Sequence, residues 1–432
     1  MQSMISYYDY KLFIFEKKND TLKLVKKNKN ILMLASTFPL SENDPVPSFV
    51  RDQIELIKYF YPNLNFFVVS PSNKNKPFSE HDQFKQYRHR YFLKKFEKFG
   101  ENGILPTLKK NFLYFFLVPF LIFSQIIYTF RFVRKNEIDL IYAHWVTPQA
   151  ITALFVNVFL NTPFVFSSHT QDAQLLTKIP VLGKVLLNLL VKRAKSIHFG
   201  SEATKNYLLN STKLKDELES KTFIFPMGIR DLKFKAISSI KPNNVNENGK
   251  IRFTFIGRFT EKKGVENLLF DFKKLIKNFK NLELVLCGSG MLHNKYKLLI
   301  KELSMENNVT ITDKFLSTEE LKYMYENSNY IVIPSIKLNN GDVEGLPVVL
   351  IESLYFGKIS ISSKDTNAEE VVTDKINGFI YDSKLKDGFF EIANQILNNK
   401  FDLKKVEQNA IKEGLKYESK NVAKVYYDHL LS

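Results

Sequence analysis

A basic loop in the second half of the chain has the composition of a phosphate-binding site. An apolar run ends at Gly257, Arg258 follows it, and Lys263 precedes Gly264 and a stretch of helical periodicity that starts at Val265. Such a strand-to-helix connection places two full positive charges beside the free N–H groups of a helix N-terminus. We predict that Arg258 and Lys263 bind a diphosphate. The alternative is that both cations are solvated side chains on a lysine-rich surface.

Two glutamates, Glu344 and Glu352, lie eight residues apart downstream of this loop. Pro347 suits the first position of a helix, which puts Glu344 in the preceding loop and Glu352 about one and a half turns inside. We expect Glu352 to accept hydrogen bonds from ribose hydroxyls and Glu344 to approach a reacting sugar. The amides that would hold a phosphate at the helix start belong to Leu346, Val348 and Val349. In the alternative interpretation Glu344 is a loop charge and Glu352 caps a neighbour.

Two histidines follow neighbouring strands in the first half of the chain. His144 and Trp145 come after one apolar run, and His169 stands between Ser168 and Thr170 after the next. Because the carboxyl ends of parallel strands meet at one edge of a sheet, both histidines are expected on the binding side of that domain. We predict a ligand contact for His169, although a lone histidine is more often structural.

The sequence offers no clear ligand set for a divalent cation. Cys287 is the only cysteine, and neither a His-X3-His pair nor an Asp-X-Asp pair at a strand end occurs. An intrachain disulfide and a Cys-based zinc site are therefore excluded. We expect no cofactor and no metal, with positive side chains neutralising the phosphates. The single cysteine and the lack of a secretory signal pattern favour the cytoplasm.

These residues are positioned by an α/β fold. From residue 31 onward, short apolar runs alternate with longer amphipathic stretches, the pattern of βαβ units and a parallel sheet. Strands are expected in the first half at residues 31–35, 66–70, 138–142, 164–167, 197–199 and 223–225. In the second half they are expected at residues 251–256, 282–286, 309–311, 330–333 and 359–362. The chain should thus form two Rossmann-like domains that face each other across a cleft.

The domain boundary is expected where periodicity disappears. Residues 236–250 are rich in Asn, Ser, Lys and Gly, which is typical of a linker. The predicted organisation is an N-terminal domain over residues 1–235 and a C-terminal domain over residues 251–416. A helix over residues 417–432 would then pack back on the N-terminal domain.

The charge balance favours anionic partners. The 432 residues include 62 Lys and Arg against 45 Asp and Glu, a net charge of +17. Nucleic acid, phosphorylated substrates and acidic lipid all fit this sign. Compositional drift is an equally good explanation, because Lys and Asn are abundant along the whole chain. The chain has no zinc-finger, RNP-like or helix-turn-helix pattern, so we expect no nucleic-acid partner.

One apolar segment is long enough to cross a bilayer. Residues 111–130 contain no charged side chain and are crowded with Phe, but Pro119 interrupts them and a strand-like run follows. We favour a helix on the N-terminal domain with one face in a lipid interface. A basic aromatic stretch over residues 85–98, together with Lys109 and Lys110, would hold it against an anionic inner leaflet. The alternatives are an internal helix beside a solvated loop, and a spanning helix.

Taken together, the motifs resemble those of the retaining glycosyltransferases of family 4, which have the GT-B fold of two facing Rossmann-like domains. The resemblance runs from about residue 31 to the end of the chain. Its opening residues 36–39 and 47–50 are similar to those of the branch that builds bacterial surface polysaccharides. Arg230 departs from the pattern, since an acidic residue is common there, and we interpret it as structural. The motifs that carry the resemblance are Gly257-Arg258, Lys263-Gly264, the two glutamates, Cys287-Gly288-Ser289-Gly290, Ile333-Pro334-Ser335 and residues 225–229 and 371–380.

The resemblance implies a metal-independent enzyme that moves a sugar from a nucleoside-diphosphate sugar to a hydroxyl of a glycan or polyprenyl-linked glycan. Arg258 and Lys263 would hold the diphosphate, Glu352 the ribose, and Glu344 and His169 the sugar, with Glu344, His169, Arg258 and Lys263 as the catalytic set. A sugar-nucleotide epimerase of the same fold is the alternative. The further donor-binding residues would be Gly345, Leu346, Pro347 and Val348, with the base stacked near Lys314, Phe315 and Leu316.

Overall fold

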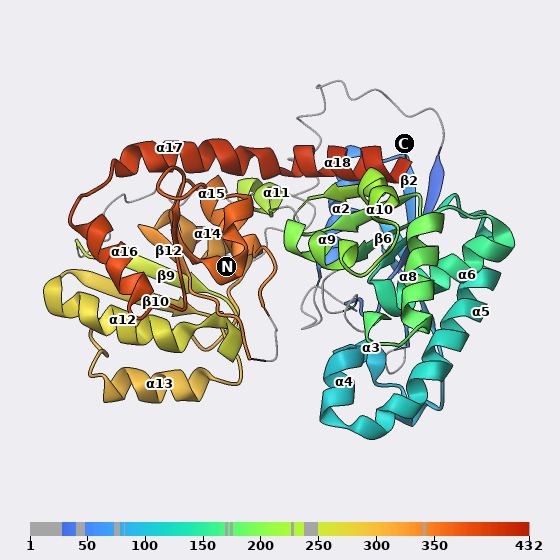
Figure 1. Ribbon diagram of the computed structural model, residues 1–432, viewed down its shortest axis with the longest axis horizontal. Helices are drawn as coiled ribbons and strands as arrows, with labels where there is room; N and C mark the ends of the chain where they lie inside the picture. The colour runs from blue at the N-terminus through green and yellow to red at the C-terminus, as the bar shows by residue number, and fades with distance from the viewer. Residues whose placement is uncertain are drawn as a thin grey trace, which may run out of the picture. The chain divides into compact units, whose positions relative to one another are not determined.

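The computed structural model shows two compact units, each built on one sheet (Figure 1). The structure describes residues 28–39, 48–72, 78–81, 83–168, 172, 176–225, 229–236, 249–339 and 343–431. Of these, residues up to 225 together with 420–431 form the N-terminal unit, and residues 229–419 form the C-terminal unit. The α/β class with two Rossmann-like halves is therefore confirmed.

The sheet of the N-terminal unit has the order β3-β4-β2-β1-β5-β6-β7-β8, parallel except for the β3–β4 pair. Its central strands are apolar and buried on both faces, as parallel strands covered by helices must be. Neither β3 nor β4 was expected from the sequence. The strands are β1 (Lys29–Leu34), β2 (Leu64–Pro71), β3 (Phe78–His81), β4 (Phe84–His89), β5 (Leu140–His144), β6 (Phe164–Ser168), β7 (Ser196–Phe199) and β8 (Thr222–Ile224).

Helices cover both faces of this sheet. Leu32 and Leu34 point into one core with α5 (Val118–Asn136), α6 (Ile151–Leu160) and α8 (Leu182–Arg193), whereas Ile31 and Met33 point into the other. That second core contains α2 (Phe49–Phe60) and α18 (Ser419–Leu431). The remaining helical segments are η1 (Lys94–Phe96), α3 (Phe99–Asn102), α4 (Ile104–Lys110), η2 (Phe112–Leu117), η3 (Val146–Ala150), α9 (Glu202–Leu209) and α10 (Lys215–Lys221).

The C-terminal unit contains a six-stranded parallel sheet of order β11-β10-β9-β12-β13-β14. Its strands are β9 (Ile251–Ile256), β10 (Leu282–Cys287), β11 (Val309–Ile311), β12 (Tyr330–Ile333), β13 (Ile359–Ser363) and β14 (Phe379–Tyr381). Its helices are α11 (Asp231–Ala236), α12 (Val265–Asn278), α13 (His293–Glu302), α14 (Thr318–Glu326), α15 (Val348–Tyr355), α16 (Gly388–Leu397) and α17 (Leu403–Gly414). Four 3₁₀ turns are found in the described part of this unit: η4 (Glu261–Lys263), η5 (Lys364–Thr366), η6 (Ala368–Glu370) and η7 (Leu415–Tyr417).

The boundary between the units lies earlier in the chain than the composition indicated. The sequence placed residues up to 235 in the N-terminal domain, but residues 229–236 belong to the C-terminal unit. Phe234 packs edge-on against Tyr325 and Phe356, and Arg230 pairs with Glu352. These contacts fix α11 to the C-terminal unit, which composition alone does not reveal. At the other end of the chain, α18 returns to the N-terminal unit, where Tyr426 packs against His198.

Candidate functional site

The basic loop after β9 is held in place by two close backbone contacts. Gly264 has a φ of +66°, and a Cβ there would lie 1.9 Å from the carbonyl oxygen of Pro334. The amide of Ile336 also donates to the carbonyl of Lys262 at 2.9 Å. On the other side, a Cβ on Gly288 would lie 1.8 Å from the carbonyl oxygen of Gly257. Glycine is therefore required where the ends of β9, β10 and β12 approach one another.

This packing brings together two residues that the sequence separates widely. The Nζ of Lys263 lies 2.8 Å from Oε2 of Glu344, and both side chains are mostly buried, at 15% and 17% exposure. Ser335 donates to the same carboxylate oxygen at 3.2 Å, and the amide of Asn367 donates to the backbone carbonyl of Glu344 at 2.8 Å. The cation predicted for the diphosphate thus faces the acid predicted for the sugar.

Arg258 extends from the same loop without such a constraint. Its side chain is exposed and forms no ion pair with any residue that the structure describes. An unpaired guanidinium next to a helix N-terminus is available for an incoming anion. The loop therefore carries Lys263, which is held by an ion pair with Glu344, and Arg258, which has no ion pair with a described residue.

Helix α15 begins one residue later than expected. Pro347 is the N-cap, with φ −77° and ψ 135°, and Val348 is the first helical residue. Leu350 donates its amide to the carbonyl of Pro347 at 3.0 Å. The amides of Val348 and Val349 occupy positions that have no intrahelical acceptor, as in any first helical turn. Gly345 is exposed and Leu346 is half-buried just before this turn.

Glu352 lies in a buried polar network that the sequence did not reveal. It is completely buried, and its two oxygens accept hydrogen bonds from Nε and Nη2 of Arg230, both at 2.9 Å. The hydroxyl of Tyr325 also donates to Glu352, at 2.7 Å. Burial and the neighbouring Glu352 charge raise the pKa of Tyr325, which keeps this hydroxyl protonated as a donor. Both carboxylate oxygens of Glu352 are thus occupied by Arg230 and Tyr325, and its contact with a ribose stays a prediction.

The segment predicted to lie near the base follows β11. Phe315 is 64% exposed, and Lys314 pairs with Glu320 at 2.6 Å at the start of α14. Thr312 in the same connection accepts the amide of Gly288 at 2.9 Å, which ties this segment to the loop after β10. An exposed aromatic ring of this kind can stack on a nucleobase. The stacking role of residues 314–316 stays a prediction.

Of the two histidines singled out in the N-terminal unit, the structure describes His144 but not His169. His144 is buried, with Nδ1 3.3 Å from Oγ of Ser167 and its ring stacked on Tyr142. His169 lies outside the described residues, as does Thr170. The sequence also missed Asp172, a buried carboxylate that accepts the amide of Val146 at 2.6 Å. Asp172 thereby fixes the turn that follows Trp145.

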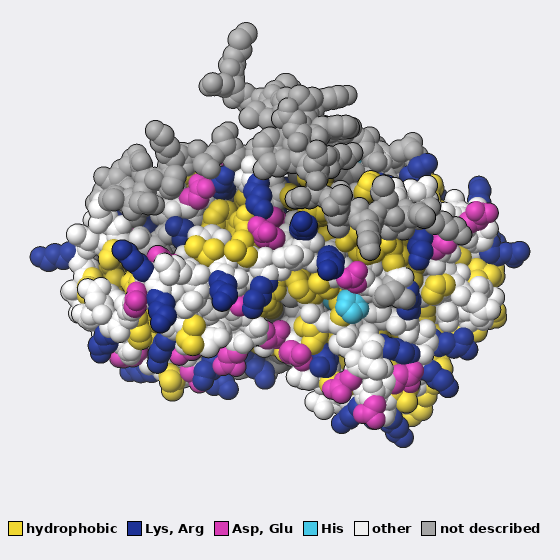
Figure 2. Space-filling view, turned by 90° about the horizontal axis from the view of Figure 1, so that it is seen from above, with side chains coloured by type: hydrophobic (Ala, Val, Ile, Leu, Met, Phe, Trp, Pro, Cys, Tyr) yellow, Lys and Arg dark blue, Asp and Glu magenta, His cyan; other side chains and the backbone are white. Residues whose placement is uncertain are grey.

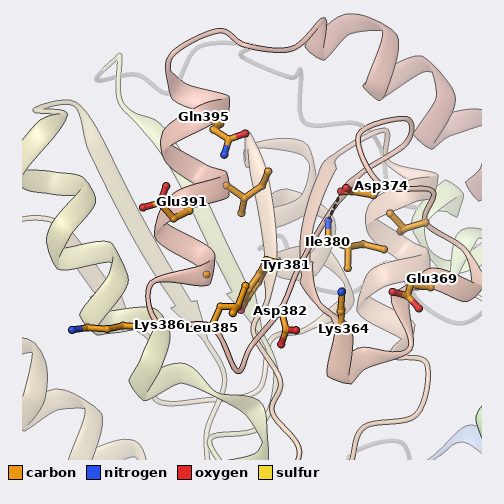
Figure 3. A pocket seen from close by; sticks show the side chains of 13 residues that line it. Lys364, Glu369, Asp374, Ile380, Tyr381, Asp382, Leu385, Lys386, Glu391 and Gln395 are labelled. Atoms are coloured by element: carbon orange, nitrogen blue, oxygen red, sulfur yellow. Dashed lines mark hydrogen bonds between the residues drawn. The ribbon is translucent and has the colours of Figure 1, made fainter.

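A separate pocket of about 510 Å³ lies in the C-terminal unit, lined by β14, α16 and the segment after β13 (Figure 3). Its labelled side chains include Lys364 and Lys386, but acids outnumber them. Among the described residues that line it, none belongs to the predicted site. Its acidic groups, Glu369, Asp374, Asp382 and Glu391, make it unsuited to a diphosphate.

The wider charge pattern does not form a nucleic-acid groove on the face shown in Figure 2, because Lys and Arg side chains there are interspersed with Asp and Glu. Within the described ranges, no group of three or more His, Cys, Asp and Glu is placed to hold a metal ion. The site as a whole consists of cations, helix amides and one restrained glutamate. It can stabilise a leaving diphosphate beside a sugar.

Comparison with known proteins agrees with this geometry. Residues 237–413 match the family described as "Glycosyl transferases group 1". An uncharacterized glycosyltransferase of Methanocaldococcus jannaschii is 23% identical over 62% of this chain and 68% of its own length. A Campylobacter jejuni alpha-1,4-N-acetyl-D-galactosaminyltransferase, whose name includes a PP-undecaprenol-linked glycan, is 26% identical over 57% of this chain and 62% of its own length.

Solved structures share the fold over nearly the whole chain. A glycosyltransferase from Rickettsia africae has a TM-score of 0.65 at 17% identity, covering 94% of this chain and 100% of its own. Anabaena HepE in complex with UDP has a TM-score of 0.62 at 13% identity, covering 93% and 99%. The two parallel sheets, the sequence relatives and the family match together show that the chain is a glycosyltransferase with the GT-B fold.

The positions of the two glutamates predict separable defects. Replacing Glu344 with Gln should lower turnover roughly 100-fold, because one preorganised group beside the sugar is lost. Replacing Glu352 with Gln should mainly weaken donor binding, by about 1.5 to 3 kcal/mol for a lost charge-assisted hydrogen bond. Donor dissociation constants and single-turnover rates measure the two effects. Parallel changes in both constants for both variants would contradict this division.

Proposed function

We propose that the chain is a retaining, metal-independent glycosyltransferase of family 4 that transfers a sugar from a nucleoside-diphosphate sugar to an acceptor hydroxyl. The main support is the contact of Lys263 with Glu344 at the strand ends, beside the start of α15. A diphosphate entering there would compete with Glu344 for Lys263. The carboxylate that it releases would lie next to the sugar attached to that diphosphate.

The charges of the site account for the bond-breaking step. Cleavage of the sugar–phosphate bond leaves negative charge on the diphosphate, which Arg258, Lys263 and the α15 amides would stabilise as it develops. The departing phosphate oxygen would take the proton of the acceptor hydroxyl on the same face of the sugar. Glu344 would stabilise the oxocarbenium-like centre, and the alternative role for it is that of a nucleophile.

The acceptor is proposed to be a glycan or a polyprenyl-linked glycan in cell-surface polysaccharide synthesis. The name of the Campylobacter jejuni relative includes such a lipid-linked glycan, and a relative from Erwinia amylovora is an amylovoran biosynthesis glycosyltransferase. A polyprenyl acceptor would present its hydroxyl at the inner face of the cell membrane. The enzyme would therefore be cytoplasmic and bind the membrane peripherally.

Product analysis with and without acceptor tests the proposed reaction. The purified chain is first screened with nucleoside diphosphates, where a ligand at 100 times its dissociation constant should stabilise the fold by about 2.7 kcal/mol. The matching nucleotide sugar is then incubated with glycan acceptors, and NMR reads the anomeric configuration of the product. Inversion would overturn the retaining mechanism. Conversion of the donor sugar without any acceptor would instead show an epimerase.

Full activity is expected in the presence of a chelator. The cations of the basic loop would neutralise the diphosphate, a role that Mg²⁺ or Mn²⁺ plays in metal-dependent transferases. Initial rates are compared in excess EDTA and after addition of each metal. Activity that disappears in EDTA and returns with magnesium or manganese would reject metal independence.

A further inference from the structure

The aromatic helix of the N-terminal unit exposes large apolar side chains and buries two polar ones. Outward residues of η2 and α5 are large and apolar, with Phe116 68%, Phe120 53% and Phe123 67% exposed. The buried face of α5 instead includes Gln125 and Thr129, both completely buried. A helix on a water-soluble domain normally turns its apolar stripe inward. This arrangement leaves a row of large aromatic side chains of η2 and α5 facing the surroundings.

The buried polar groups beneath α5 are incompletely paired. Both polar side-chain atoms of Gln125 and the hydroxyl of Thr129 have no hydrogen-bond partner within the described part of the chain. Ser124 Oγ donates to the carbonyl of Leu121 at 3.0 Å and lies 3.2 Å from Nδ1 of His89. Burial lowers the pKa of that histidine to about 3. The neutral His89 therefore adds no charge to this layer. The buried contacts of α5 therefore do not account for the exposed aromatic side chains on its outward face.

The apolar surface continues over the neighbouring helices. α5 contacts α6, and α6 contacts α8, on the same side of the sheet (Figure 1). Phe130 of α5 and Phe159 of α6 meet edge to face with ring centroids 6.4 Å apart. α8 adds a stripe at helical spacing. The exposed apolar side chains of α6 and α8 are Phe155, Val158 and Phe159, and Leu182, Val185 and Leu189.

The charged side chains within the segments that form this surface are all cations. The segments 104–136, 151–160 and 176–193 contain no Asp or Glu. Lys95 lies 4.9 Å over the Phe96 ring beside it. Exposed cations border the apolar residues, namely Lys94, Lys95, Lys110, Arg131, Lys184, Lys192 and Arg193. Aromatic side chains within a ring of cations match the composition of an interfacial lipid-binding surface.

Part of the basic stretch over residues 85–98, which the sequence predicted to bind lipid, is buried in the structure. Arg88 is buried and donates to the carbonyls of Phe38 and Pro71, at 2.7 and 3.2 Å. His89 and Tyr91 are buried as well. These residues belong to β4 and its continuation, so they hold the sheet together and cannot reach a lipid surface.

We propose that the outer surface of η2, α5, α6 and α8, with its cationic border, docks on an anionic lipid bilayer. This deepens the proposed function, since it rests on a lipid-linked acceptor. α5 lies along the interface and does not cross the bilayer. Although residues 112–136 are apolar and long enough to span, Phe132 packs on Phe67 and Tyr87 in the core. A second copy of the chain fits this surface less well, because a two-fold contact would bring like charges together.

Vesicle sedimentation of the full chain tests the proposal. Binding to vesicles containing phosphatidylglycerol should exceed binding to pure phosphatidylcholine at least tenfold and fall in high salt. The variant F112S/F116S/F123S should lose binding at least tenfold, and K94Q/K95Q should weaken it. The matched control M291S/L298S replaces exposed apolar side chains of the C-terminal unit, 92% and 62% exposed, and should bind normally. Thermal unfolding confirms that each variant is folded.

Every other outcome overturns the proposal. Equal binding to neutral vesicles would show that the cationic border does not contribute to docking. The absence of binding to either kind of vesicle would show that this surface does not dock on lipid. Release only by detergent would show a spanning helix, and a concentration-dependent dimer abolished by the triple variant would show that a second copy covers the surface. Transfer to a water-soluble glycan and to a polyprenyl-linked glycan is measured separately. The absence of transfer to both in a chain that binds vesicles would contradict the proposed function and leave lipid docking intact.

Discussion

Replacing Lys263 with alanine should lower turnover by roughly 30- to 1000-fold, the largest effect expected of any single change on catalysis. Removal of one preorganised charge that acts on a developing anion costs about 2 to 4 kcal/mol in the barrier. Lys263 is mostly buried and held by Glu344, so its position is set before the donor binds. The same range is expected for Arg258→Ala. Single-turnover rates at saturating donor measure both.

The neighbouring lysine provides a matched control for this prediction. Lys262→Ala removes the same charge one residue away, while the backbone carbonyl of Lys262 that accepts the amide of Ile336 is retained. Turnover of this variant should remain within about threefold of the wild type, as expected for a partly exposed charge. Near-normal turnover of folded K263A and R258A proteins would show that the loop is only a solvated surface.

Replacing Arg230 with leucine should lower the free energy of unfolding by about 3 to 5 kcal/mol, the largest stability effect expected. Glu352 is completely buried, and loss of the guanidinium leaves its charge with only the Tyr325 hydroxyl. Breaking a buried ion pair by removing one partner is strongly destabilising. The 34% exposure of the Arg230 side chain favours the lower end of this range. Urea denaturation measures the change.

A double-mutant cycle separates the pair from other contacts of Arg230. The variant R230L/E352L removes both charges and should recover most of the stability, because no buried charge remains unpaired. Arg230 also lies over the Phe234 ring at 5.6 Å. This contact is lost in both R230L and R230L/E352L, so it cancels when the stabilities of these two variants are compared. A double variant as unstable as R230L alone would show that Arg230 acts through α11 and not through Glu352.

The interpretation of Arg230 as structural rests on a departure from a family pattern, and its partner could not have been found from the sequence. Arg230 and Glu352 are 122 residues apart, and each separately is an ordinary charged side chain. The same holds for Lys263 and Glu344, whose motifs were recognised individually. A long-range ion pair depends on how strands are ordered in the sheet, which local periodicity does not encode.

Local chemistry did determine the main elements of this protein. Continuous apolar runs such as that of β1 cannot be solvated on either face, so a parallel sheet covered by helices follows from them. The glycines at 264 and 288 mark loops where backbones meet too closely for a side chain. β4 was missed because its sequence, with Lys85 and Arg88, reads as polar, although Arg88 is buried by pairing with carbonyl groups.

The sequence alone thus determined the two α/β halves, the basic loop and the glutamate pair, because these depend on residues close together in the chain. Only the tertiary structure decided that α11 belongs to the C-terminal unit, that Glu352 is enclosed by Arg230 and Tyr325, and that α5 turns its Phe side chains outward. An apolar helix has the same periodicity whether its aromatic face meets a core or a lipid surface. Burial is a property of packing between distant segments, so no local pattern can specify it.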